Sequence, residues 1–206
     1  MRSIIKKETG QKVKVGHTGT LDPFATGLMV ILVGDATRDA QKYSKLDKTY
    51  EVEMTLGQTS STGDPEGELT KISTQAPELK EIEQTLKSFA GEIEQIPPKF
   101  SAIKVDGKRA YQLARAGKEV KIDPRKVLIH KIELTSYDYP KVLFNCQVSS
   151  GTYVRSLCED IGNKLNTGAY CSALKRTKVG KFDIKDAIPI DGLTYESIQK
   201  QLHLRS

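Results

Sequence analysis

The sequence is poor in the residues that build metal centres and disulfide frameworks. Its 206 residues include no tryptophan, three histidines and three cysteines. The cysteines stand at positions 146, 158 and 171, and no two of them form the close pair that binds a metal. The histidines are scattered as well, so we expect no metal site. We interpret the cysteines as buried or half-buried thiols of a reducing cytosol.

Long apolar runs are also absent. No run approaches the length of a membrane span, and the N-terminus lacks the apolar segment of a signal peptide. We therefore expect a soluble, cytoplasmic protein with no membrane partner. A chain of 206 residues is long enough for one compact core and a small appendage.

Charge, by contrast, is plentiful and unevenly spread. The formal net charge of +6 favours a polyanionic partner. Residues 99–126 hold nine Lys or Arg against three acidic residues, a net of +6 that equals the excess of the whole chain. A solvated face is the ordinary explanation of such a run, but its concentration in one stretch favours an element that contacts phosphates. Residues 64–94 hold eight acids and three bases, and we expect that surface to face away from RNA.

The spacing of apolar residues predicts an α+β fold with mostly antiparallel pairing in one domain. Residues 48–56 alternate cleanly between apolar and polar, as in a half-buried strand. A phase shift between Ile129 and Ile132 predicts a bulge. Strands are predicted at 28–33, 48–56, 127–134, 142–149 and from 169, and helices before Gly10, over 38–46, from Pro77, from Gly151 and over 195–204.

The stretch from Gly16 to Gly27 is the strongest candidate for chemistry. Its three glycines and its proline exclude regular helix or strand, so we expect a shaped loop that leads into the apolar run 28–33. The loop holds one carboxylate, Asp22, just before Pro23, and a residue before proline favours extended geometry. A rigid loop of this kind can present a nucleophile or a base. The alternative is that Asp22 only accepts backbone amides in a turn.

Arg155 is the second candidate. It lies in the first turn of the helix predicted from Gly151, one position away from the apolar stripe. A cation at a helix N-terminus opposes the helix dipole and costs some tenths of a kcal/mol. This position is favourable only if an anion lies nearby. The alternative is an ordinary surface or phosphate-binding arginine.

A resemblance joins these observations. Residues 16–23 read Gly-His-Thr-Gly-Thr-Leu-Asp-Pro, and Ala25-Thr26-Gly27 follow. This stretch resembles the active-site motif of the bacterial tRNA pseudouridine synthase B (TruB) family. Four further stretches are similar to other motifs of that family in its own order: 47–67, 95–108, 151–157 and 174–180. The resemblance implies the pseudouridine synthase fold, a mixed but mostly antiparallel central sheet flanked by helices, with an RNA-binding thumb insertion at about 97–126.

The family usually begins with a strand and a Lys-Pro-x-Gly-x-Thr-Ser loop, and bacterial members usually carry a C-terminal PUA domain. The resemblance therefore implies that residues 1–206 are an N-terminally incomplete catalytic domain without a PUA domain. The activity it implies is the isomerisation of uridine 55 in the T-loop of tRNA to pseudouridine, without metal or cofactor. The base must leave its stack and enter a water-poor pocket. The expected partner is the T-arm of tRNA, with no guide RNA, and the protein is expected to be a monomer.

The resemblance also assigns roles to single residues. Asp22 matches the catalytic carboxylate, which could attack the sugar or the uracil ring or act as a base. Arg155 matches the arginine that pairs with it, and Tyr50 matches a tyrosine that stacks on the target base and helps to move a proton. Substrate-binding positions are His17, Tyr50, Tyr153, Leu174, Lys104 and Lys108.

Three of the substrate-binding assignments have a plainer alternative. Tyr50 and Leu174 could be ordinary core residues, and His17 a turn histidine bonded to backbone. Two other functions remain open at this point. One is a noncatalytic RNA-binding or tRNA-folding module that uses the basic stretch. The other is a phosphate-binding enzyme, although the glycine loop lacks the lysine of a P-loop.

Overall fold

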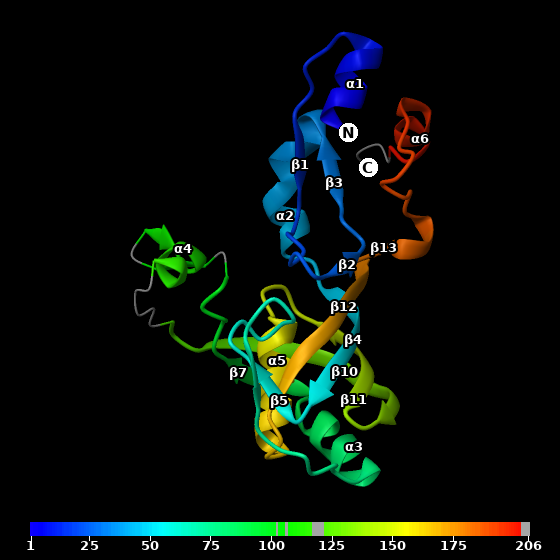
Figure 1. The fold of residues 1–206 in the computed structure, drawn as a ribbon. Helices are drawn as coiled ribbons and strands as arrows, with labels where there is room; N and C mark the ends of the chain where they lie inside the picture. The colour runs from blue at the N-terminus through cyan, green and yellow to red at the C-terminus, as the bar shows by residue number, and fades with distance from the viewer. Residues whose placement is uncertain (102, 106, 117–121, 203–206) are drawn as a thin grey trace.

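The computed structural model describes residues 1–101, 103–105, 107–116 and 122–202. Its centre is a sheet in the strand order β13-β12-β4-β11-β10-β7, to which β2 is added at β12 (Figure 1). Only the β2–β12 pair is parallel in this described sheet. The strands are β2 Thr26–Gly27, β4 Lys48–Leu56, β7 Gly91–Gln95, β10 Arg125–Asp138, β11 Lys141–Val148, β12 Ala169–Val179 and β13 Phe182–Asp183. The predicted α+β class with a mixed, mostly antiparallel sheet is confirmed.

Two helices, α3 (Leu79–Ser88) and α5 (Val154–Lys164), pack against one face of the sheet and close the core. Alternate residues of β4 and β11 point toward these helices, and the helices turn apolar stripes toward the strands. A period of two in the strands and of 3.6 in the helices brings these faces together. Buried members of the core include Val52, Met54, Phe144, Ile82, Leu157 and Ile161.

Most of residues 1–44 form an arm beyond the end of β4 and β12 (Figure 1). Helix α1 ends at Gly10, as predicted, and a short two-stranded sheet pairs β1 with β3. The helix predicted over 38–46 is a 3-10 turn followed by one short α-helix. The elements are α1 Arg2–Thr9, β1 Val15–His17, β3 Ile31–Val33, η1 Gly34–Asp39 and α2 Ala40–Ser44.

The strand predicted over 28–33 is wrong in its extent. Residues 26–27 pair with β12 and residues 31–33 pair with β1, and no strand joins them. The Leu28 amide donates to the carbonyl of Arg176 at 2.7 Å, which turns the chain from one partner to the other. The apolar run therefore bridges two sheets instead of filling one strand.

Strand β10 and strand β11 form a long hairpin whose register shifts between Ile129 and Lys131, so the predicted bulge is confirmed. The C-terminal part of the chain adds η2 (Ile184–Asp186) and α6 (Tyr195–Lys200), and α6 contacts α1. Residues 203 and 204 of the helix predicted over 195–204 lie outside the described residues. No helix within the described ranges has the length and apolar character to cross a membrane.

The stretch predicted as a thumb follows β7 and projects to one side of the sheet (Figure 1). Its described elements are β8 Lys104–Val105, β9 Lys108–Arg109 and α4 Ala110–Arg115, and β8 pairs with β9. Residues 102, 106 and 117–121 lie outside the described residues. The loop between β4 and α3 holds the remaining short pair, β5 Gln58–Ser60 with β6 Leu69–Lys71.

Candidate active site

Asp22 lies in the turn between β1 and β2. The Ala25 amide donates to the Asp22 carbonyl at 2.9 Å and closes the turn, and the Thr18 amide donates to the Val30 carbonyl at 3.2 Å. Backbone bonds on both sides therefore fix the loop. The Asp22 side chain keeps 35% of its surface exposed, so a substrate can reach it from solvent.

Arg155 holds this carboxylate from the first turn of α5. Its Nε donates to Asp22 Oδ2 at 3.0 Å and its Nη2 donates to Asp22 Oδ1 at 3.2 Å. This is the two-pronged arginine–carboxylate pair, which fixes both distance and orientation. The predicted pairing of Asp22 with Arg155 is confirmed, and the anion that favours a cation in this helical turn is present.

The other N–H groups of Arg155 are also used. Nη1 donates to the Thr62 carbonyl at 2.9 Å and to Asp64 Oδ2 at 3.1 Å, and Nη2 also donates to the Phe100 carbonyl at 3.1 Å. All five donors of the guanidinium thus have an acceptor. The Arg155 side chain is only 4% exposed. Its position is therefore determined by the protein before any substrate binds.

Asp64 is a second carboxylate on the same guanidinium, and no role was predicted for it from the sequence. Its side chain is 4% exposed. Its Oδ1 accepts from the Thr62 hydroxyl at 2.5 Å and from the Glu66 amide at 3.0 Å. A signal was available, because Asp64, like Asp22, stands directly before a proline in a glycine-containing loop. One arginine therefore lies between a buried carboxylate and an accessible one.

Two further acids follow one turn along α5. Burial raises the pKa of Glu159 to about 7, with Asp160 and Asp64 adding to the effect and Arg155 opposing it. Burial also raises the pKa of Asp160 to about 6. A Cβ on Gly63, whose φ is +74°, would lie 2.5 Å from Glu159 Oε1, so only glycine leaves room for this carboxyl. The charges of Glu159 and Asp160, one turn along α5 from Arg155, therefore change close to neutral pH.

Tyr50 is half-buried at the start of β4 and packs against the core. Burial raises the pKa of Tyr50, the neighbouring Arg176 lowers it through its charge and a hydrogen bond, and Asp22 raises it slightly. The pKa of Tyr50 thus responds both to the charge of Arg176 in β12 and to that of Asp22.

Tyr153 stands at the N-terminal cap of α5, two residues before Arg155. The fully buried amide of Gln95 holds its backbone on both sides, accepting from the Tyr153 amide at 2.7 Å and donating to the Tyr153 carbonyl at 2.9 Å. The guanidinium of Arg125 lies 5.0 Å from the centre of the Tyr153 ring, a cation–π contact. The end of β7 is thus joined to the helix that carries Arg155.

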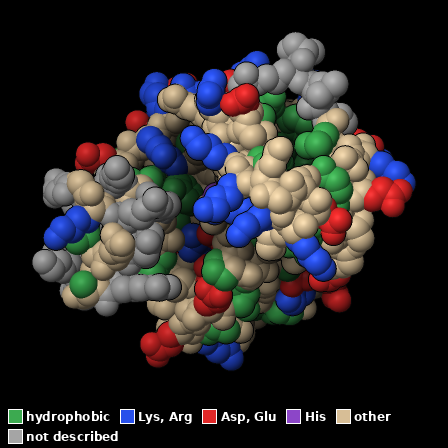
Figure 2. Space-filling model, turned by 90° about the horizontal axis from the view of Figure 1, so that it is seen from above, with side chains coloured by type: hydrophobic (Ala, Val, Ile, Leu, Met, Phe, Trp, Pro, Cys, Tyr) green, Lys and Arg blue, Asp and Glu red, His purple; other side chains and the backbone are tan. Residues whose placement is uncertain are grey.

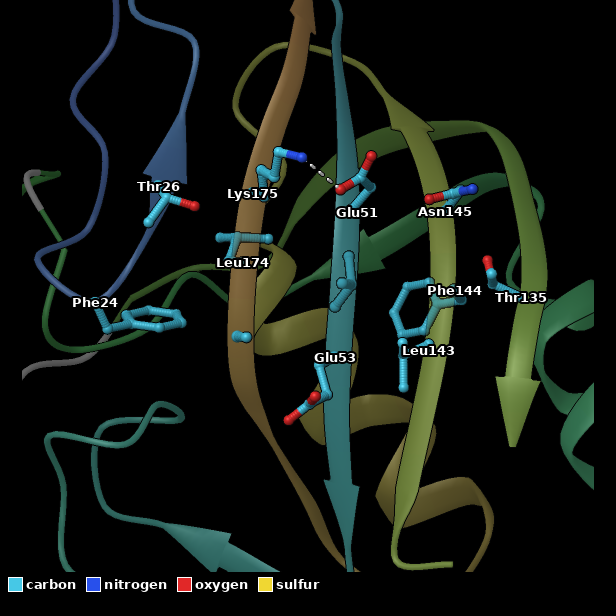
Figure 3. Close-up of a pocket in the computed structure, with 12 residues that line it drawn as sticks. Phe24, Thr26, Glu51, Glu53, Thr135, Leu143, Phe144, Asn145, Leu174 and Lys175 are labelled. Atoms are coloured by element: carbon cyan, nitrogen blue, oxygen red, sulfur yellow. Dashed lines mark ion pairs between the residues drawn. The ribbon is translucent and has the colours of Figure 1, made fainter. Parts of the chain in front are cut away.

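Leu174 is buried in the core and also lines a groove of about 510 Å³. Figure 3 shows this groove on the face of the sheet opposite α5, with Phe24 and Thr26 of the Asp22 loop at its side and outward residues of β4 and β11 along its floor. Its rim is polar and includes the ion pair of Lys175 with Glu51. Asp22 and Arg155 do not line it, so this groove is not the Asp22–Arg155 site.

Two of the remaining predicted positions lie at the surface. His17 is exposed at the end of β1, and Lys108 is exposed in β9. Lys104 stands in β8, but its side chain lies outside the described part of the chain. Seen from above, the molecule is hollowed between the lobe of α4 and the main body, and Lys and Arg side chains gather around the hollow (Figure 2).

The chemistry that this arrangement supports is that of a fixed, accessible carboxylate. Both oxygens of Asp22 are oriented by one arginine, and a phenol lies nearby. Such a group can bond reversibly to an electrophilic carbon or take a proton. Among the described residues, no group of three or more His, Cys, Asp or Glu could hold a metal ion.

Two family profiles together match residues 6–204 of this chain. The profile described as TruB family pseudouridylate synthase (N terminal domain) matches residues 6–154. The profile described as tRNA pseudouridylate synthase B C-terminal domain matches residues 155–204. Fold, site and profiles together define the enzyme class of the pseudouridylate synthases. Within that class the chain belongs to the TruB family, as the resemblance of its motifs indicated.

Individual relatives agree with this assignment. The tRNA pseudouridine synthase B of Clostridium kluyveri is 44% identical over 202 residues, which are 98% of this chain and 68% of the relative. A crystal structure of a Cbf5–Nop10–Gar1 complex matches 97% of this chain and 50% of its own, with a TM-score of 0.70 and 32% identity. A structure of an H/ACA RNP bound to a substrate RNA containing 2′-deoxyuridine matches 90% of this chain and 45% of its own, with a TM-score of 0.63 and 30% identity.

Proposed function

We propose that this chain converts uridine 55 in the T-loop of tRNA to pseudouridine, with Asp22 as the catalytic carboxylate. The observation that carries the proposal is the two-pronged hold of buried Arg155 on both oxygens of Asp22, whose side chain is still one-third exposed. A reacting group of this kind is oriented before substrate arrives, which reduces the entropic part of the barrier. The relative from Clostridium kluyveri carries the name tRNA pseudouridine synthase B.

The reaction breaks the bond between ribose C1′ and uracil N1 and makes one between C1′ and C5. The C5 carbon then loses its proton and N1 takes one up, so the product is an isomer of uridine. The base must be out of its stack for this rearrangement. Asp22 reacts with the extruded nucleotide, and Tyr50 stacks on its base. Arg155 keeps the carboxylate in place through both steps. Tyr153 and Leu174 serve as apolar walls, because water in the pocket would favour hydrolysis over rejoining.

The RNA is held around the hollow of Figure 2. His17 lies on the arm side of the Asp22 loop, at the end of β1. On the opposite side we assign the stretch 97–126, with Lys104 and Lys108, to contacts with phosphates. The acidic stretch 64–94 contributes no such contact. The substrate is the T-arm stem-loop itself.

We further propose that the protein acts as a monomer in the cytoplasm and needs no guide RNA. Thr18 and the Phe24-Ala25-Thr26 stretch resemble the stand-alone bacterial enzymes, and identity is higher to a tRNA pseudouridine synthase B than to Cbf5. The chain spans 68% of that curated relative and 50% of the Cbf5 chain. The catalytic residues assigned above all lie within the matched part.

The test is to incubate the protein alone with a synthetic T-arm stem-loop and to map pseudouridine by position. We expect pseudouridine at position 55 and none in a stem-loop with cytidine there. Product at another position would refute the site. Binding of the stem-loop without any product would refute catalysis and favour a tRNA-folding module.

A further inference from the structure

Arg176 is a buried cation that the assignments above do not use. It lies in β12 and is 3% exposed. Within the described part of the chain it forms no ion pair with a carboxylate. Burial of a charge is costly unless the charge is compensated, so packing alone would favour an apolar side chain here.

The guanidinium of Arg176 binds both ends of the loop that carries Asp22. Nε donates to the Leu28 carbonyl at 2.8 Å, and Nη2 donates to the Gly19 carbonyl at 3.1 Å. The backbone carbonyl of Arg176 also accepts from the Leu28 amide at 2.7 Å. One residue thus fixes the loop before and after Asp22.

The backbone of Arg176 packs closely against Gly27 at the end of the Asp22 loop. Gly27 pairs with Arg176 in the parallel β2–β12 ladder. A Cβ on Gly27 would lie 2.3 Å from the Arg176 carbonyl oxygen, and the Gly27 φ of +105° already favours glycine. A shift of β12 at this position would therefore move the loop with it.

Arg176 also faces the second proposed catalytic residue. It is the register partner of Tyr50 across β4 and β12. Its charge and a hydrogen bond lower the pKa of Tyr50, against the effect of burial. Arg176 therefore bonds the backbone of the Asp22 loop and lies opposite Tyr50 in the neighbouring strand, although the loop and Tyr50 come from different parts of the sequence.

We propose that Arg176 is a positioning residue that sets the Asp22 loop and the Tyr50 phenol at their working separation. This inference rests on the proposed function. It does not repeat the role of Arg155, which binds the Asp22 carboxylate itself, whereas Arg176 binds the backbone of the loop. A lysine can keep the charge but cannot bond both loop carbonyls through a planar fork.

The test compares Arg176→Met, Arg176→Lys and the control Lys175→Met in the full chain. Lys175 precedes Arg176 in β12, is half exposed and pairs with Glu51 on the other face. The control therefore also replaces a cation by methionine, but outside the site. The measurements are the single-turnover rate at saturating T-arm stem-loop, its Kd, and the pH at which Tyr50 ionises, read as the absorbance difference from the matching Tyr50→Phe protein.

We expect Arg176→Met to lower the single-turnover rate about tenfold or more with Kd changed by less than about threefold, because misplacement affects the reacting geometry. We expect Tyr50 to ionise at higher pH in Arg176→Met, and Arg176→Lys to restore that pH but not the full rate. A rate within twofold of the parent, or equal losses in Arg176→Met and Lys175→Met, would overturn the proposal.

Two outcomes need a separate readout. If Arg176→Met does not fold, Arg176→Lys decides, since a full rate in that variant excludes a need for the fork. If the parent protein makes no pseudouridine, the proposed function fails, but hydrogen exchange at the Leu28 amide still tests the positioning. Faster exchange in Arg176→Lys than in Lys175→Met then supports the hold on the loop, and equal exchange refutes it.

Discussion

Replacement of Asp64 by Asn tests whether the buried carboxylate fixes Arg155. Asp64 and Arg155 are each 4% exposed in their side chains, so solvent screens their attraction little. In the parent, Asp64 accepts from three donors: Arg155 Nη1, the Thr62 hydroxyl and the Glu66 amide. An asparagine has one acceptor oxygen, so its NH2 group must face at least one of these donors.

The loss in free energy of unfolding expected for Asp64→Asn follows from comparable substitutions in other proteins. Removal of one partner of a buried ion pair costs about 3–5 kcal/mol because the other charge stays buried. Arg155 keeps its bonds to Asp22, so we expect the lower end, about 3 kcal/mol, from a total that is typically 5–15 kcal/mol. The free energy of unfolding from urea titrations measures it. We also expect the single-turnover rate to fall, because Arg155 then orients Asp22 less firmly.

The control is Glu66→Gln, in the same loop. The Glu66 side chain is exposed and only its backbone amide bonds to Asp64, so we expect a change within about 0.5 kcal/mol. A loss below 1 kcal/mol in Asp64→Asn, or a loss equal to the control, would refute the role assigned to this carboxylate.

Three further predictions follow from the same structure. Gly27→Ala places a Cβ against the backbone of β12 at a φ of +105°. We expect it to lower the free energy of unfolding, measured by thermal denaturation, by about 1–3 kcal/mol. The control Gly10→Ala, also at positive φ but with open space around it, should lower it less. Because Glu159 has a pKa raised from 4.5 to about 7, the folded state keeps a proton that the unfolded chain releases, so stability falls as pH rises between these values. Glu159→Gln should remove about 2 kcal/mol of that fall, after allowance for partial exposure, and an unchanged pH dependence between pH 5 and 8 would contradict this. Lys108→Glu should weaken binding of the T-arm stem-loop and flatten its salt dependence, whereas Lys87→Glu in α3 should do neither; equal salt slopes in both variants would count against the thumb contact.

The sequence predicted those parts of the fold that depend on local periodicity. The alternation of β4 and the apolar stripe of α5 are found where the spacing placed them. The pairing of Asp22 with Arg155, 133 residues apart, came from motifs and not from periodicity. The position of Arg155 at a helix N-terminus predicted only that some anion lies nearby, and the resemblance named Asp22 as that anion.

Other parts depended on tertiary contacts that no local pattern records. The apolar run 28–33 reads as one strand, but the bond from the Leu28 amide to Arg176 divides it between two sheets. Asp64 reads as an ordinary turn acid, because its burial depends on α5 packing over the loop. The two hydrogen bonds between Gln95 and Tyr153 join residues 58 positions apart, and although both stand in stretches that resemble family motifs, no local pattern links them.

The account depends most on the carboxylate of Asp22. Single-turnover conversion of the T-arm stem-loop by Asp22→Asn, at a concentration where binding is saturated, tests it most directly. Asparagine keeps the shape of the side chain but neither the charge nor the second acceptor for Arg155. The account predicts that pseudouridine formation is lost while the Kd for the stem-loop stays within about threefold of the parent. Product formed at the parent rate would contradict it.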